Sequence, residues 1–281
     1  MQIFFKIYGT LIIAIVALIQ PWVRTLWKKC FQQGKIEIYR TGDIEIGYSA
    51  FGTTIGLNGT LRCINRDLFV QSIKLKLTKQ KDSSKHDFEW GAFRSEQLST
   101  KGREVSATLP RGFILSTISP FPYSIQFHDA ELKSDIIKKL IKLKNEWSKV
   151  IYDVGRPEML RILSQHTPFP PELDALYKNF SKSEIHVSSF TSLDRMCYWE
   201  ASKYTMKLTI STSKPDKFFN KIYKFTLTEQ DIQLIRLNIV KLLQDVCGHP
   251  SIGDYFFAYP KYEEVKPRTN QETKKTSRRI S

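Results

Sequence analysis

Alternating apolar and polar positions recur between residues 35 and 128 and predict half-buried β-strands. The pattern is clearest over 70–78, where apolar side chains alternate with Lys74 and Lys76. The polar run 79–85 is typical of a hairpin loop that leads into another strand at 87–93. Turn signals recur about every ten residues, which favours an antiparallel β-sandwich of immunoglobulin-like or arrestin-like architecture.

Helical spacing replaces this alternation after residue 128. Over 129–152 the apolar side chains recur every three or four residues, which predicts an amphipathic helix of about five turns. They are Ile136, Leu140, Leu143, Trp147 and Ile151. A short helix at 172–180, with Pro171 suited to its first turn, follows a proline-rich break. Strand alternation returns at 185–190.

The last apolar segments predict a β-hairpin and a helix. The hairpin pairs 205–211 with 221–227, in which lysine and threonine alternate with apolar side chains. Thr228 is a natural N-cap for the helix that follows, because its side chain can accept a backbone N–H. This helix runs to about Val246, and Gly248 ends it.

The order of these elements predicts an α+β protein that is mainly β. We expect an anchor and juxtamembrane segment, the sandwich strands, a helical insertion, a hairpin with a C-terminal helix that completes the body, and a basic disordered tail. Their ranges are 1–30, 31–128, 129–182, 183–259 and 260–281. A sandwich followed by a separate small α+β domain is the alternative division.

An uncharged segment at 7–23 predicts a single transmembrane helix. As a helix it would be about 26 Å long, against about 30 Å for the core of a bilayer. The predicted anchor residues are Ile7, Leu11, Ile12, Ile13, Ile15, Val16, Leu18, Ile19 and Trp22. Arg24, Lys28 and Lys29 outnumber Lys6 across the span, which predicts a cytoplasmic body. A cleaved signal peptide, a buried helix and a helix lying flat on the membrane are the alternatives.

Positive charge dominates the chain, with 43 Lys and Arg against 28 Asp and Glu and a formal net charge of +15. The densest basic groups fall on the predicted helix after residue 128 and in the tail. They are Lys138, Lys139, Lys142, Lys144, Lys149, Lys274, Lys275, Arg278 and Arg279. Such a patch can contact anionic lipid or an acidic protein, and the alternative interpretation is a solvated surface.

Residue patterns of known catalytic or cofactor sites do not emerge from the chain. The glycines between 47 and 59 lack the Lys-Ser/Thr pair and the helix of a phosphate-binding loop. Cys247 and His249 lack a second ligand pair at metal-binding spacing. His86 would need a converging group from elsewhere in the fold to act as a base. We therefore expect no catalytic residue, no metal and no cofactor.

The leading hypothesis is a membrane-anchored binding, adaptor or sensor protein with a protein partner, because an anchor and a β scaffold are predicted without visible chemistry. A membrane-bound hydrolase or transferase with a dispersed active site is an alternative of another class. A nucleic-acid-binding module that uses the basic surface is a third possibility, although no reading motif is present.

Overall fold

The computed structural model describes residues 17–23, 25, 34–99, 102–153, 171–213, 215–249 and 254–265. Ten strands form one antiparallel sheet. They are β1 (Lys35–Ser49), β2 (Gly52–Ile64), β3 (Leu68–Lys79), β4 (Lys85–Ser99), β5 (Gly102–Thr108), β6 (Phe113–Leu115), β7 (Phe121–Asp129), β8 (Ser202–Ser213), β9 (Lys217–Leu227) and β10 (Tyr262–Glu264). The order across the sheet is β1-β2-β7-β4-β3-β8-β9-β10, and β5 and β6 extend it by pairing with β4 and β3.

The sheet curls until its two edges approach each other, so that it is nearly closed around an apolar core. Arg40 of β1 lies over the ring of Tyr223 in β9 at 5.4 Å and over that of Tyr262 in β10 at 4.0 Å. Ile46 and Ala258 also form an isolated bridge across this seam. The predicted two-sheet sandwich is therefore wrong. Alternation shows only that each strand buries one face, and one strongly twisted sheet buries that face as well as two stacked sheets do.

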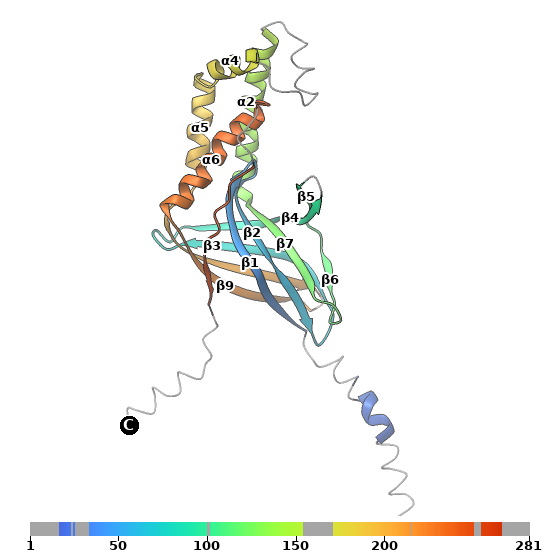
Figure 1. Ribbon diagram of the computed structural model, residues 1–281. Coiled ribbons are helices and arrows are strands. Elements are labelled where there is room, and N and C mark those ends of the chain that lie inside the picture. Colours follow the sequence, from blue (N-terminus) through green and yellow to red (C-terminus); the bar gives the residue numbers. More distant parts are fainter. Residues whose placement is uncertain are drawn as a thin grey trace, which may run out of the picture.

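Four helices stand together at one end of the sheet (Figure 1). They are α2 (Ala130–Asp153), α4 (Pro171–Phe180), α5 (Glu184–Met196) and α6 (Glu229–Val246). The buried side of α2 carries the five apolar residues that the sequence predicts. Thr228 caps α6 as predicted, in a capping box with Asp231. Both predictions succeed because they rest on local spacing and local hydrogen bonds.

The predicted strand at 185–190 is wrong, because these residues belong to helix α5. Ser183 caps the helix by accepting the backbone N–H of His186 at 3.4 Å. The buried side chains His186, Ser189 and Leu193 recur at helical spacing. The helical part of the chain thus extends past residue 182. The predicted tail also contains a regular element, because Tyr262–Glu264 form strand β10.

Two side chains in the segment between α5 and β8, Tyr198 and Trp199, join the helices to the sheet. The Trp199 Nε1–H donates to the carbonyl of Gly47 in β1 at 3.0 Å. The hydroxyl of Tyr198 donates to Asp129 Oδ2 at 3.0 Å, at the point where β7 becomes α2. Trp199 is fully buried and packs its ring near those of Phe88 and Tyr204. The junction is therefore a packed core with directed hydrogen bonds.

The predicted membrane anchor is corrected by the structure. No helix in the described part of the chain is long and apolar enough to cross a membrane. Six predicted anchor residues lie outside the described residues, namely Ile7, Leu11, Ile12, Ile13, Ile15 and Val16. Leu18, Ile19 and Trp22 lie in a described helical stretch at 17–23, which spans only about 10 Å. The prediction of a single-pass membrane protein with a cytoplasmic body is wrong on this finding.

Acidification is expected to destabilise the fold before the carboxylates titrate. Burial is the largest cause that lowers the pKa of His86, His128 and His186. The unfolded chain therefore binds more protons than the folded chain as the pH falls below about 6.5. The contribution of the neutral histidines to stability is fully present above that pH and is lost progressively below it. Urea unfolding at pH 7.5 and 5.5 should show a lower free energy of unfolding at pH 5.5.

The variant His186→Gln tests whether histidines cause this loss. It removes one of the three groups, so the difference in unfolding free energy between the two pH values should become smaller. An equal difference in the parent and in His186→Gln would contradict a contribution from His186. Stability that stays level or rises on acidification would contradict the prediction as a whole.

Candidate ligand-binding pocket

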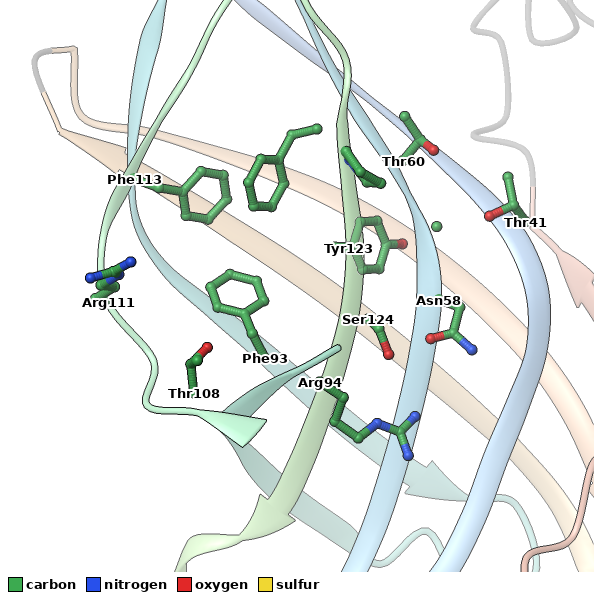
Figure 2. Close-up of a pocket in the computed structure, with 13 residues that line it drawn as sticks. Thr41, Asn58, Thr60, Phe93, Arg94, Thr108, Arg111, Phe113, Tyr123 and Ser124 are labelled. Atoms are coloured by element: carbon green, nitrogen blue, oxygen red, sulfur yellow. The ribbon is translucent and has the colours of Figure 1, made fainter. Parts of the chain in front are cut away.

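A hollow of about 670 Å³ opens in the wall of the sheet. Its lining residues come from β1, β2, β4 and β7, from the last residue of β5, from the first residue of β6 and from the segment between β5 and β6. They are Thr41, Asn58, Gly59, Thr60, Phe93, Arg94, Thr108, Arg111, Phe113, Phe121, Pro122, Tyr123 and Ser124. Figure 2 shows Phe93 and Phe113 on one side, Thr41, Asn58 and Thr60 on the other, and Tyr123 between them.

The pocket exists because β4 stops pairing with β7 at this point. The ladder between β4 and β7 ends at the pair Phe93–Ile125, and Phe93 also begins the ladder with β5. An irregularity between Trp90 and Ala92 precedes this point. Beyond it β3 pairs with β6 instead of β4. The ladder with β4 therefore stops short of residues 121–124 of β7, and the wall of the sheet is open beside them.

Aromatic rings form one wall of the opening. Phe113 and Phe121 are stacked with ring centroids 4.3 Å apart, and Phe93 meets them edge-on at 5.8 and 5.9 Å. Trp90 lies behind Phe93 at 4.6 Å. The three phenylalanines are only partly buried, unlike the fully buried rings of the core. Partly exposed rings that face a hollow can gain contact area from an apolar ligand.

Polar groups without protein partners line the other side. Asn58 and Ser124 lie directly opposite each other in the ladder between β2 and β7. Within the described part of the chain, no hydrogen bond reaches Asn58 Oδ1, Ser124 Oγ or the hydroxyl of Tyr123. Burial raises the pKa of Tyr123 to about 12, so its hydroxyl stays protonated and can donate. Buried polar atoms normally have partners, so these three groups mark the pocket as a place for a polar ligand or water.

Two arginines supply the charge of the pocket. Arg94 is largely buried and pairs with Glu45 at 2.6 Å, and Gly56 leaves room for this pair because a side chain there would collide with both. Arg111 is exposed at the rim. None of the lining residues is a carboxylate. Because Glu45 neutralises the charge of Arg94, Arg111 gives the pocket lining its net positive charge.

The basic residues predicted from the sequence do not contribute to this pocket. The five predicted lysines of α2 lie on the helix that rises from the far end of β7, and two of them pair with carboxylates one turn away. Lys138 pairs with Asp135 at 3.5 Å, and Lys149 pairs with Glu146 at 2.8 Å. Lys274, Lys275, Arg278 and Arg279 lie outside the described residues. A partner for these groups stays a prediction.

The other candidate residues have structural roles. Cys247 caps the C-terminal end of α6, where burial raises its thiol pKa to about 12, and Gly248 adopts a positive φ as a helix-ending residue does. His86 stacks on Tyr198 with centroids 3.7 Å apart, beside Asp129. Among the described residues, no group of three His, Cys, Asp or Glu side chains could hold a metal ion.

Sequence reasoning missed the lining of the pocket. The aromatic residues at 93, 113, 121 and 123 belong to three different strands, and no periodic pattern links them. The only local signals are Gly91 at the irregularity of β4 and Gly112, which follows Arg111. A side chain at position 91 would collide with His128, and one at position 112 with Phe69. Glycines that allow such close approach mark irregular strands but do not identify a pocket.

No protein-family model matches the chain, and no curated protein is similar to it.

Proposed function

We propose that this protein is a ligand-binding domain whose pocket between β2, β4 and β7 accepts a small amphipathic anion. The ligand places an aromatic or short hydrocarbon group against Phe93, Phe113 and Phe121, and its anionic end reaches Arg111. The observation that carries the proposal is the half-buried aromatic wall beside Arg111, which no carboxylate of the lining neutralises, and beside polar groups that have no hydrogen bond within the described part of the chain.

The expected affinity follows from the size of these contacts. Burying about 100 Å² of apolar ligand surface is worth about 2.5 kcal/mol, and a charged hydrogen bond adds about 1.5–3 kcal/mol. The loss of ligand freedom reduces this sum. A dissociation constant of about 0.1 mM or weaker is therefore expected, which suits a small molecule that is bound reversibly.

Anilinonaphthalene sulfonate tests the proposal because it joins an aromatic group to a sulfonate. We expect it to bind with one-to-one stoichiometry, to fluoresce, and to change the emission of Trp90, which lies behind the wall. Replacing Arg111 by glutamine should weaken binding about tenfold, the effect of losing one charged hydrogen bond. The neutral analogue phenylnaphthylamine should bind both proteins equally.

Arg62→Gln is the matched control, because Arg62 is exposed on β2 and does not line the pocket. This variant should bind the sulfonate as the parent does. Equal weakening by Arg62→Gln and Arg111→Gln would show a general charge effect and contradict the proposed site. Binding at many weak sites, with no change in Trp90 emission, would contradict it as well.

A further inference from the structure

The outward face of β3, β8 and β9 carries lysines in adjacent rows. The ladder places Lys76 directly opposite Lys207, and it places Lys74 opposite Thr209. On the other side of β8, Lys224 lies opposite Thr205. All four of these lysines are exposed. Like charges directly opposite each other in an antiparallel pair destabilise it, so the Lys76–Lys207 pair has a cost that the fold tolerates.

Carboxylates offset only part of this charge. Asp87 pairs with Lys76 at 3.3 Å, and Glu89 lies opposite Lys74 in the ladder with β4. Glu263 of β10 lies opposite Lys224. Further exposed lysines border the same face, at Lys85, Lys203 and Lys261. The face therefore keeps an excess of positive charge, which favours a polyanionic partner.

Two exposed aromatic rings stand beyond the lysines on the same face. Phe218 of β9 is 65% exposed and lies opposite Ser211, while Phe69 of β3 is 42% exposed and lies opposite Ser213. Ser72 and Ser211 share a hydrogen bond of 2.6 Å between the two rings and the lysines. Planar rings on an open strand surface can stack with flat groups of a ligand.

A shallow hollow of about 370 Å³ lies at the opposite end of this face. Lys203, Lys224 and Lys261 line it together with Gln80, Thr226 and one carboxylate, Glu263. Three ammonium groups against one carboxylate leave the hollow with a net positive charge that can neutralise a phosphate group, and the amide and hydroxyl can donate further hydrogen bonds to its oxygens. Aromatic rings and phosphate-binding groups thus lie at the two ends of one lysine-lined surface.

We propose that this face binds single-stranded nucleic acid. We name it the lysine platform, and it consists of Phe69, Lys74, Lys76, Lys207, Phe218 and Lys224. The lysines contact phosphates, and the two rings stack on bases, which is the combination that single strands require. Hydroxyl and amide groups occupy the centre of the face, as in the hydrogen bond from Thr209 to Asn220. A polar centre suits a polynucleotide better than lipid acyl chains.

A fluorescein-labelled twenty-nucleotide oligothymidylate tests this proposal by fluorescence anisotropy with the full chain. Four lysine–phosphate contacts predict a slope of log affinity against log salt of about −2.8, which is about 50-fold weaker binding at 200 mM than at 50 mM salt. The double variant Lys76→Gln/Lys207→Gln should reduce this loss to about sevenfold, because two contacts remain. Phe218→Ala should weaken binding about tenfold at either salt concentration.

The double variant Lys142→Gln/Lys144→Gln is the matched control, because it removes the same charge from exposed positions of α2. It should leave the affinity and its salt dependence unchanged. Equal effects of the two double variants would overturn the proposal in favour of general electrostatic attraction. Failure to bind the oligonucleotide at 50 mM salt would overturn it as well. Binding instead to phosphatidylserine vesicles, weakened by the platform variants, would assign the face to lipid. The platform shares no residue with the pocket lining, so none of these outcomes affects the proposed pocket.

Discussion

Replacing Asp129 by alanine is expected to lower the free energy of unfolding by about 3 kcal/mol. Asp129 is 4% exposed, and its Oδ1 accepts the backbone N–H groups of Glu131 at 3.0 Å and Leu132 at 3.3 Å. The side chain therefore caps α2, which is worth about 1 kcal/mol. Its Oδ2 also accepts the hydroxyl of Tyr198, and a buried donor left without its acceptor costs about 1–3 kcal/mol more.

Two further variants separate the cap from the buried hydrogen bond. Asp129→Asn keeps an oxygen for the two amides but loses the carboxylate at Tyr198, so we expect a loss of about 1–2 kcal/mol. Asp135→Ala removes an exposed carboxylate from the same helix and should cost less than about 0.5 kcal/mol. Urea unfolding followed by circular dichroism measures all three. A cost for Asp129→Ala no larger than that for Asp135→Ala would contradict the role of Asp129.

Features that depend on local spacing could be predicted from the sequence. The hairpin of β8 and β9, the buried stripe of α2 and the Thr228 cap follow from side chains a few residues apart. The outward direction of Lys74 and Lys76 was also predictable, because alternation along one strand fixes which side chains share a face. These patterns need no information about which strands become neighbours.

The way the strands assemble could not be predicted in this way. β3 lies beside β8, and their contact between Ser72 and Ser211 joins positions 139 residues apart. β7 lies between β2 and β4, so the hairpin-like order of the sequence is not the order of the sheet. Alternating patterns are the same in a curled sheet and a sandwich, and the mistaken architecture came from this ambiguity.

The strand at 185–190 failed for a local reason. Ile185, Val187 and Phe190 are β-branched or aromatic residues that favour strands. The cap at Ser183 and the packing of Leu193 against the sheet overrode this propensity, since Leu193 is fully buried and its carbonyl accepts the hydroxyl of Tyr48 at 3.2 Å. Tertiary contacts of this kind are absent from a periodicity argument.

Both proposed sites depend on pairings that are not visible in the sequence. The pocket requires β4 to leave β7 at Phe93, and the lysine platform requires β3 and β8 to bring Lys76 beside Lys207. The dense lysines of α2 were the obvious basic group in the sequence because they lie close together along the chain. The platform lysines come from separate hairpins, so only the sheet order brings them together.

Replacing Trp199 by alanine is expected to have the largest effect of all, a loss of about 4 kcal/mol in the free energy of unfolding. The side chain is fully buried at the junction between helices and sheet, and removing a buried tryptophan costs about 3–5 kcal/mol through lost contacts and the cavity left behind. The carbonyl of Gly47 would also lose its donor. Trp199→Phe keeps a ring in the same place and should cost about half as much.

The matched control is Tyr152→Ala, which removes an aromatic ring that is 75% exposed on α2 and should change stability by less than about 0.5 kcal/mol.

Trp199 and Asp129 should also be energetically coupled, because Tyr198 touches both: its ring lies 5.5 Å from that of Trp199, and its hydroxyl donates to Asp129. The double variant Asp129→Ala/Trp199→Ala should therefore lose at least about 0.5 kcal/mol less than the sum of the single losses, because the second substitution removes interactions already disrupted by the first. Strict additivity would show that Tyr198 does not connect the two residues energetically, and that the helix cap and the buried indole stabilise the junction independently.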